Sequence, residues 1–342
     1  MLSIQCAEGR PALAITSRRR GNSVRTTIFS VGLFAFWAAL CSLNAVLMKV
    51  VMDSGLSATA LATMRAWIVT AVLLAVTGLV NRKLLAVRKA DLLGLAAYGV
   101  VGLGLTSATY VWAISEIPIG VALVLQYLAP VIVTLWARIV WKRRIHRITW
   151  LGNAICLAGL ALTAEPGLGG RLTIGGICLA LVSGLCFAAS FLFAESGLRA
   201  RHPLTQVTWG YVFGSAAWIV LTSSRPMPWH AFAPEVRLPS ALGAERMPTW
   251  LLVAVIATLG SAGASLVLAY GVRLIGAPRA GVLGMLEPVA GISIGWAVLG
   301  QTLSPLQLVG AGVALFGVVA AELPHLRINR AADATQELPL RV

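Results

Sequence analysis

The chain has 342 residues, of which 58% are hydrophobic and only 11% are charged. A soluble domain carries about a quarter charged residues, whereas the apolar residues here form blocks of roughly 20, the length of a membrane-crossing helix. The composition excludes a soluble protein, and the net charge of +15 lies in short segments between apolar blocks, which is typical of topology signals and not of a nucleic-acid surface.

The pattern predicts an all-α polytopic membrane protein. A basic segment, residues 1–27, comes first and is predicted to be a cytoplasmic tail, and a second tail covers residues 323–342. Ten spans lie between them with mostly short connections, except for 223–249, whose five prolines indicate an irregular outer loop. The predicted spans are 28–50, 58–79, 92–114, 118–141, 149–164, 173–194, 204–222, 250–272, 280–299 and 305–322.

Connections rich in lysine and arginine alternate along the chain with connections that have few of them. With the N-terminus inside, the inner segments hold 20 of these residues and the outer segments hold four. Positive residues accumulate on the cytoplasmic side of membranes. We therefore predict that both termini are cytoplasmic and that the protein lies in the inner (cytoplasmic) membrane.

The two halves of the chain resemble each other. Residues 120–160 align without a gap on residues 278–318, and ten of the 41 positions are identical, including one proline. The offset of 158 residues indicates two repeats of five spans, 28–164 and 173–322. Because five is odd, the second repeat starts from the opposite side, and the repeats are inverted. This arrangement is typical of secondary transporters, with substrate near the midplane.

The ninth predicted span contains a carboxylate followed by a proline, Glu287 and Pro288. Small residues that include Gly284 and Gly291 recur along one face of this helix, and Glu287 borders that face, so it points into protein or a cavity. An intramembrane carboxylate is a functional-site hypothesis by default. We predict that Glu287 couples protons or contacts a substrate amine. The alternatives are a structural ion pair and a protonated acid that donates one hydrogen bond.

Pro288 has a repeat equivalent, Pro130, in the fourth predicted span. Neither residue can donate a hydrogen bond to the carbonyl four positions earlier, and each ring bends its helix. The freed carbonyls need polar side chains, water or substrate as partners. We predict two kinked helices that face each other, and kinks that only shape the bundle explain the prolines equally well.

Arg65 lies about seven residues inside the second span, where a charge must pair or reach the surface. We predict a structural or gating ion pair with Asp53, Glu116 or, less favourably by depth, Glu287. Lys49 is expected to reach the outer surface, one turn from Asp53.

Other polar and aromatic side chains also fall within the spans. Hydroxyl groups in spans more often join helices than bind ligands, and most tryptophans anchor at the interface. Side-chain amides are costly to leave without partners. We predict that the cavity is lined, besides Glu287, by Trp37, Asn44, Tyr110, Gln126 and Tyr127.

Taken in order, these features resemble the drug/metabolite transporter superfamily and, within it, the EamA-like family. The resemblance covers about 28–322 and rests on Trp37, on the arginine of "ATMRAW", on the prolines of "QYLAPV" and "MLEPV", and on the glycine-rich last span of each half. It departs from the family pattern where Gln301 follows Gly300 and where Ala38 follows the tryptophan. The resemblance implies a secondary transporter for small metabolites, and it implies an exporter more often than an importer.

The sequence contains no phosphate-binding loop, metal-ligand spacing or catalytic cluster. We therefore expect no enzyme activity, metal or cofactor. The predicted function is alternating-access export of amino acids, nucleosides, related compounds or drugs, with a proton gradient or simple exchange as the driving force. A non-transporting sensor or scaffold is the alternative. The expected partners are a small-molecule substrate, protons and lipid, with no nucleic acid, and the oligomeric state is open.

Overall fold

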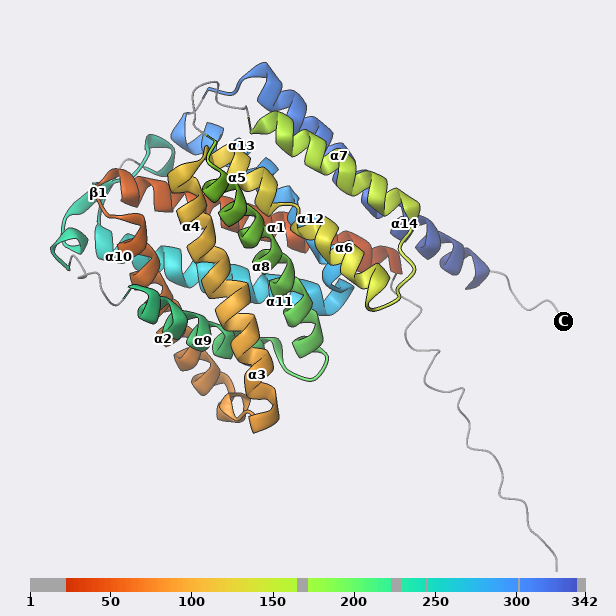
Figure 1. The fold of residues 1–342 in the computed structure, drawn as a ribbon, viewed down its shortest axis with the longest axis horizontal. Coiled ribbons are helices and arrows are strands. Elements are labelled where there is room, and N and C mark those ends of the chain that lie inside the picture. The colour runs from red at the N-terminus through yellow and green to blue at the C-terminus, as the bar shows by residue number, and fades with distance from the viewer. Residues whose placement is uncertain (1–22, 165–171, 223–228, 244, 301, 337–342) are drawn as a thin grey trace, which may run out of the picture.

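The computed structural model describes residues 23–164, 172–222, 229–243, 245–300 and 302–336, and it is mostly helical (Figure 1). Eight helical stretches in this part of the chain are long and apolar enough to cross a membrane. The protein is therefore a multi-pass helical membrane protein. The two other predicted spans, 149–164 and 204–222, are helices as well, one of only 17 residues and one richer in polar side chains.

The first half of the chain contains seven α-helices and two irregular helical segments. In chain order they are α1 (Ser23–Asp53), α2 (Ala58–Asn81), the 3₁₀ turn η2 (Arg82–Leu85), α3 (Lys89–Ala97), the π-helical η3 (Tyr98–Leu105), α4 (Thr106–Glu116), α5 (Ile119–Gln126), α6 (Ala129–Ile139) and α7 (Arg147–Thr163).

The second half follows the same plan and adds a small hairpin. Its elements are α8 (Ile174–Leu198), α9 (Pro203–Thr222), the 3₁₀ turn η4 (Trp229–Phe232), β1 (Glu235–Arg237), the 3₁₀ turn η5 (Ser240–Leu242), β2 (Arg246–Pro248), α10 (Thr249–Val255), the π-helical η6 (Ile256–Gly263), α11 (Ala264–Ile275), α12 (Ala277–Gly284), α13 (Leu286–Leu299) and α14 (Pro305–Gln336).

The helix irregularities recur at the offset of 158 residues found in the sequence. The π-helical segments η3 and η6 are separated by that offset at both ends, and so are the breaks after α5 and α12. Pro130 and Pro288 come just after these breaks, and each lacks the N–H that a continuous helix needs. The two predicted kinks are therefore present, at equivalent positions.

The glycine-rich helices α7 and α14 lie against each other (Figure 1). A Cβ atom on Gly152 would lie 2.8 Å from the carbonyl oxygen of Gly317, and one on Gly159 would lie 2.6 Å from that of Gly310. Position 152 thus meets 317 while 159 meets 310, so the two helices run antiparallel. Only residues without side chains allow this backbone approach.

Hydroxyl groups join α2 of the first half to α9 of the second. Each bond satisfies a polar group inside an apolar bundle, as expected for helix–helix contacts in membranes. The bonds run between Thr63 and Trp218 (2.9 Å), Thr70 and Ser215 (2.7 Å), and Thr77 and Thr208 (2.8 Å).

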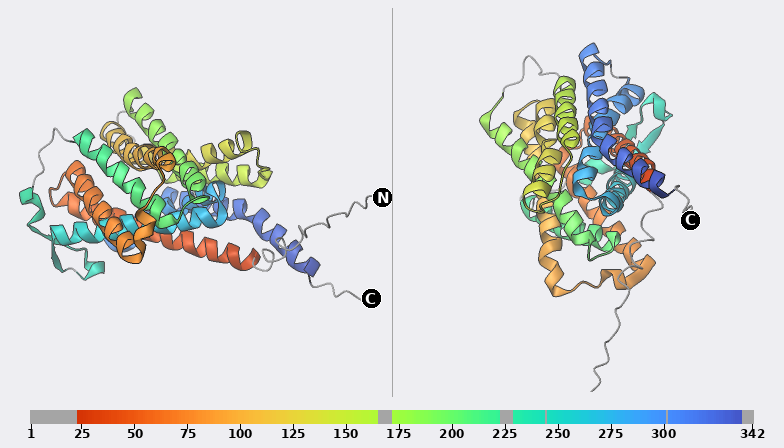
Figure 2. Two further views of the ribbon diagram at one scale, coloured as in Figure 1. Left: turned by 90° about the horizontal axis from the view of Figure 1, so that it is seen from below. Right: turned by 90° about the vertical axis from the view of Figure 1, so that its right-hand side faces the viewer.

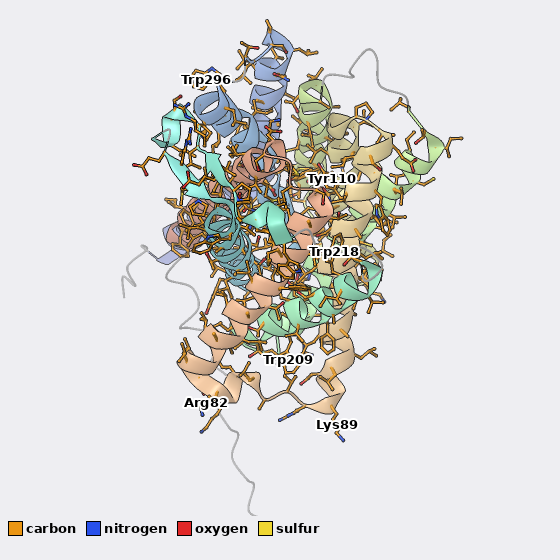
Figure 3. All side chains as sticks on the ribbon, turned by 90° about the vertical axis from the view of Figure 1, so that its left-hand side faces the viewer. Arg82, Lys89, Tyr110, Trp209, Trp218 and Trp296 are labelled. Carbon is orange, nitrogen blue, oxygen red and sulfur yellow. The ribbon has the colours of Figure 1, made fainter. Side chains whose placement is uncertain are left out.

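The molecule has two different ends. We call one the basic end, because it holds the connections marked by Arg82 and Lys89 (Figure 3). The start of α1 and the end of α14 lie away from the β1–β2 hairpin (Figure 2, left), and we call the end that carries the hairpin the hairpin end. Trp296 lies towards the hairpin end in Figure 3.

The connection 223–249 is more ordered than the irregular loop that its prolines predicted. Its described part folds into η4, η5 and an antiparallel hairpin in which Val236 pairs with Met247. Phe232 and Val236 are each 5% exposed and join an apolar cluster with Leu61 on α2. Apolar side chains alternating with the prolines therefore anchor this connection to the bundle. Residues 223–228 lie outside the described part.

The bounds of the two predicted tails differ from the helix bounds in the structure. Helix α1 already begins at Ser23, and α14 continues to Gln336 without a break at position 323. Residues 1–22, 337–342 and Gln301 lie outside the described residues.

Candidate functional site

Glu287 lies in the first turn of α13, directly after the break that separates α12 from α13. A carboxylate is favoured there because the free N–H groups of a helix start carry partial positive charge. Its backbone carbonyl accepts a hydrogen bond from Ser42 Oγ of α1 at 3.1 Å. Its side chain is partly buried and shares a hydrogen bond with Tyr127, which donates its hydroxyl. The breaks of the two halves thus meet at this pair.

Two other side chains face the same carboxylate. Tyr110 of α4 and Cys41 of α1 both lie within electrostatic range of Glu287. Figure 3 places Tyr110 well inside the helical bundle, between Trp296 towards the hairpin end and Trp218. The structure therefore brings together three of the predicted cavity residues, Glu287, Tyr127 and Tyr110.

Gln126, the last residue of α5, makes a short polar chain. Its Nε2 donates to Ser183 Oγ at 2.9 Å, and Ser183 Oγ donates to the carbonyl of Thr106 at 3.1 Å. This chain uses one side of the Gln126 amide and leaves its oxygen free for another donor. Gln126 is therefore a partly satisfied polar group at the break after α5.

Trp37 of α1 lies against the break of the second half, beside Gly284 at the end of α12. It is 4% exposed, packs edge-to-face on Phe34 at 5.9 Å, and lies 3.8 Å from where a Cβ atom on Gly284 would be. The indole is therefore part of the packed wall around the break. It does not present an open ring face.

The small-residue face of α12 and α13 is covered by other helices. A Cβ atom on Gly291 would lie 3.8 Å from Ser42 Oγ of α1, and one on Gly281 would lie 3.4 Å from Cα of Pro130. Neighbouring helices therefore pack against this face at both positions. The second contact also brings the two proline-broken helices of the two halves against each other.

Asn44 lies elsewhere, beside the π-helical segment η6. A Cβ atom on Gly260 would lie 2.0 Å from Asn44 Oδ1, so only glycine fits at that crossing. The Nδ2 atom of Asn44 donates to Met48 Sδ at 3.9 Å. Asn44 is thus separated from the group around Glu287.

The predicted ion pair of Arg65 is wrong for the part of the chain that the structure describes. Asp53 pairs with Lys49 at 3.5 Å instead, and both side chains are exposed. Glu116 accepts a hydrogen bond from a threonine at the start of α8, and Glu287 bonds Tyr127. The prediction failed because it ranked the candidate partners by depth alone, without their direction around each helix.

A cluster of charged residues at the basic end was missed by the sequence analysis. The carboxylate of Glu195, near the end of α8, accepts hydrogen bonds from Arg143, from Arg199 at 3.0 Å and from the backbone N–H of Ala277 at 2.7 Å. Arg143 follows α6, so this carboxylate connects the two halves. A cleft of about 450 Å³ opens beside it, lined by Arg143 and Arg199.

Two further pairs hold the same end. Each joins a buried or partly buried carboxylate to an arginine, one in the connection between α8 and α9 and one in the first turn of α12, so each charge that leaves water gains a partner. The sequence signal was the scarcity of acid: the whole chain has only 12 Asp and Glu residues, and several stand at the basic ends of spans. The pairs are Arg201 with Asp91, at 2.8 Å, and Arg279 with Glu322.

The chemistry available at the Glu287 site is binding and proton exchange. Among the described residues, no group of three or more His, Cys, Asp and Glu side chains could hold a metal ion. A carboxylate with one tyrosine donor, at a helix break between two halves, can bind a cation or take up a proton.

Comparison with known proteins places the chain among transporters. The EamA-like transporter family matches it twice, at residues 28–164 and 174–321. An uncharacterized transporter of Archaeoglobus fulgidus is 29% identical over 67% of this chain and 75% of its own length. The threonine/homoserine exporter RhtA of Escherichia coli is 26% identical over 74% of this chain and 77% of its own.

A further relative is also named as a transporter, and a solved structure has the same fold. The uncharacterized inner membrane transporter YicL of Salmonella typhimurium is 27% identical over 71% of this chain and 77% of its own length. One crystal structure superposes with a TM-score of 0.70, covers 88% of this chain and 99% of its own, and shares 18% identity. At that identity it shows the common fold only.

Proposed function

The chain belongs to the EamA-like transporter family, and on that premise we propose that it is a secondary active transporter that exports small metabolites. Substrate binds between two inverted repeats, approximately 28–164 and 173–322, and alternating access exposes it to each side in turn. The amino-acid class is favoured among the candidate substrates, because one relative is named as a threonine/homoserine exporter.

The inverted arrangement is supported by the crossing of α7 and α14. These helices are repeat equivalents, since Gly152 and Gly310 are 158 residues apart and so are Gly159 and Gly317. Equivalent helices that run antiparallel require halves of opposite orientation. On this proposal α7 and α9 complete a set of ten spans, and the basic end with both chain ends faces the cytoplasm of an inner membrane.

The observation that carries the proposal is the pair of Glu287 and Tyr127. Each residue comes from a helix break, one in each half, so a movement of one half against the other changes the surroundings of this carboxylate. Glu287 is proposed to hold the substrate's ammonium group or a coupling proton. Its removal therefore stops transport without removing the bundle.

The test is flux of labelled threonine, homoserine, nucleosides and cationic drugs in proteoliposomes with and without an imposed proton gradient. We expect Glu287→Gln to lower the flux of the transported compound at least ~10-fold, the loss expected when a charged hydrogen-bonded contact is removed. Asp53→Asn is the matched control, because it removes an equal charge from an exposed position. Wild-type protein that moves none of these compounds above empty vesicles would overturn the proposal, as would full activity of Glu287→Gln.

A further inference from the structure

Arg65 of α2 differs from the other arginines for which the structure shows a partner. Four arginines at the basic end reach a carboxylate, namely Arg143, Arg199, Arg201 and Arg279. Arg65 lies within a span and is partly buried, and its hydrogen-bond partner among the described residues is a thioether: Nη1 donates to Met48 Sδ at 3.4 Å. Sulfur is a weak acceptor, so the guanidinium charge is left without an anion among the described residues.

The remaining nitrogens of the Arg65 guanidinium are not fully buried. Its five N–H groups need acceptors, and the described residues provide only the sulfur. Yet none of its nitrogens belongs to the buried side-chain atoms that lack a partner, as Nε of Arg201 does. Apart from Nη1, the donors of Arg65 have no protein acceptor among the described residues and are not fully buried, so a ligand that reaches them can accept their hydrogen bonds.

A second donor converges on the same sulfur. Asn44 Nδ2 of α1 donates to Met48 Sδ at 3.9 Å, so donors from α1 and α2 point at one weak acceptor. Tyr211 of α9 lies within electrostatic range of Arg65, and its hydroxyl is joined to Ser265 Oγ at 2.9 Å. The guanidinium of Arg65 carries a positive charge and its N–H groups suit an anion, whereas Asn44 Oδ1 is a buried acceptor that has no partner among the described residues.

The geometry points to one site for one carboxylate: we propose that Arg65 and Asn44 bind the carboxylate group of the transported amino acid. A planar guanidinium matches a carboxylate with two parallel hydrogen bonds. Within the predicted spans the other two basic residues are Lys49 and Arg138. Both are exposed, so this site offers a single positive charge. That charge balances a monoanion better than a phosphate.

This inference rests on the proposed function and divides the substrate path into two positions. The guanidinium of Arg65 contacts Met48 of α1, and the backbone carbonyl of Glu287 contacts Ser42 of the same helix. Six residues of helix separate those contacts, which is about 9 Å along the axis. The charged groups of an α-amino acid are much closer together than that. The substrate therefore occupies the Glu287 position and the Arg65 position in succession, with Arg65 nearer the hairpin end.

The hairpin end covers this second position. Phe232 of η4 and Val236 of β1 share an apolar cluster with Leu61, which lies one helical turn before Arg65 on the same face of α2, and Met48 packs against that cluster. The described part of the connection between α9 and α10 therefore lies over the α2 segment that carries Arg65. A substrate released at that end would pass beneath it.

Chemical modification tests the site without relying on transport. Phenylglyoxal reacts with accessible arginines, and mass spectrometry of the protein in proteoliposomes gives the modified fraction of each arginine. We expect Arg65 to react, and threonine or acetate to slow its reaction at least ~10-fold, whereas threonine amide does not. Arg138 is the matched control, because it is exposed on a span and should react equally in all conditions. An unreactive Arg65, or equal protection by the amide, overturns the inference.

Transport selectivity provides the second measurement. Wild-type protein should move threonine about tenfold faster than threonine amide. Arg65→Met should lower the threonine flux to that of the amide and leave the amide unchanged, while Arg138→Met should alter neither. Equal loss for both compounds would show a structural role and sink the inference. If wild-type protein moves neither compound, the amino-acid substrate class of the proposed function fails, and protection of Arg65 by acetate still decides whether the carboxylate site exists.

Discussion

The two helix breaks of the molecule have the same backbone and different chemistry. Helix α5 ends at Gln126 and α12 ends at Gly284, and the same offset relates the two positions. In the first half the amide of Gln126 bonds Ser183, whereas in the second half Gly284 packs beneath Trp37. The contrast is sharper three residues later, where the first half has the buried Ala129 and the second has Glu287.

This difference separates what the fold requires from what the function uses. A proline near each break is enough to interrupt the helix, and it is present in both halves. The residue at position 129 or 287 does not alter the break, so it can differ between the halves. One carboxylate in a nearly symmetric frame gives the transporter one chemically distinct side for cation or proton binding.

The largest expected effect comes from making the halves alike in charge. Ala129 is fully buried, and Ala129→Glu places an ionisable side chain there in a helix start that already packs tightly. We expect a loss of about 2.5–3.5 kcal/mol of stability, the cost of an acid at the centre of a membrane helix. Thermal unfolding in detergent measures this loss.

The double variant Ala129→Glu with Glu287→Ala moves the carboxylate from one half to the other. We expect no recovery of flux in proteoliposomes, because Tyr127 and Ser42 hold only position 287. A stable, active double variant would show that the two halves are interchangeable.

The next effect tests the contact between α7 and α14, to which the two halves should contribute equally. A Cβ atom on Gly159 would lie 2.4 Å from the backbone N of Ala314, and one on its equivalent Gly317 would lie 2.6 Å from that of Cys156. We expect Gly159→Ala and Gly317→Ala to destabilise the protein equally, each by about 1–3 kcal/mol, because backbone atoms must shift.

Gly312→Ala is the matched control for this pair of variants. It lies on α14 like Gly317, but a Cβ atom there would meet nothing within 4 Å. We expect no loss in the thermal unfolding of this variant, since alanine favours helix over glycine by up to ~1 kcal/mol. Unequal losses at positions 159 and 317 would contradict a symmetric α7–α14 contact.

Much of the helical scaffold could be predicted from the sequence because its causes are local. The eight long apolar stretches follow from composition, the two breaks follow from Pro130 and Pro288, and the glycine contacts of α7 and α14 follow from small residues at helical spacing. The grouping of Glu287 with Tyr127 and Tyr110 agrees with the predicted cavity list, since polar residues in spans avoid lipid.

The remaining features depend on contacts between distant segments. The partner of Glu195 is Arg143, 52 residues away, and no periodicity predicts which arginine reaches it. Arg65 was expected to find a carboxylate, but the direction of α2 turns it towards Met48. The connection between α9 and α10 was expected to be irregular because of its prolines, yet Phe232 and its apolar neighbours anchor it to the bundle.

The smallest expected effect tests the polar contact that only the first half has. Gln126→Ala removes the donor to Ser183 Oγ, and Ser183 keeps its own bond to the carbonyl of Thr106. We expect a loss of about 0.5–1.5 kcal/mol, the net contribution of one hydrogen bond, in thermal unfolding. Ser183→Ala should cost a similar amount, and the double variant should cost less than the sum if the bond is the shared cause. Strict additivity would mean that Gln126 acts on something other than Ser183, and a simultaneous loss of threonine flux would then identify the free oxygen of its amide as a substrate contact.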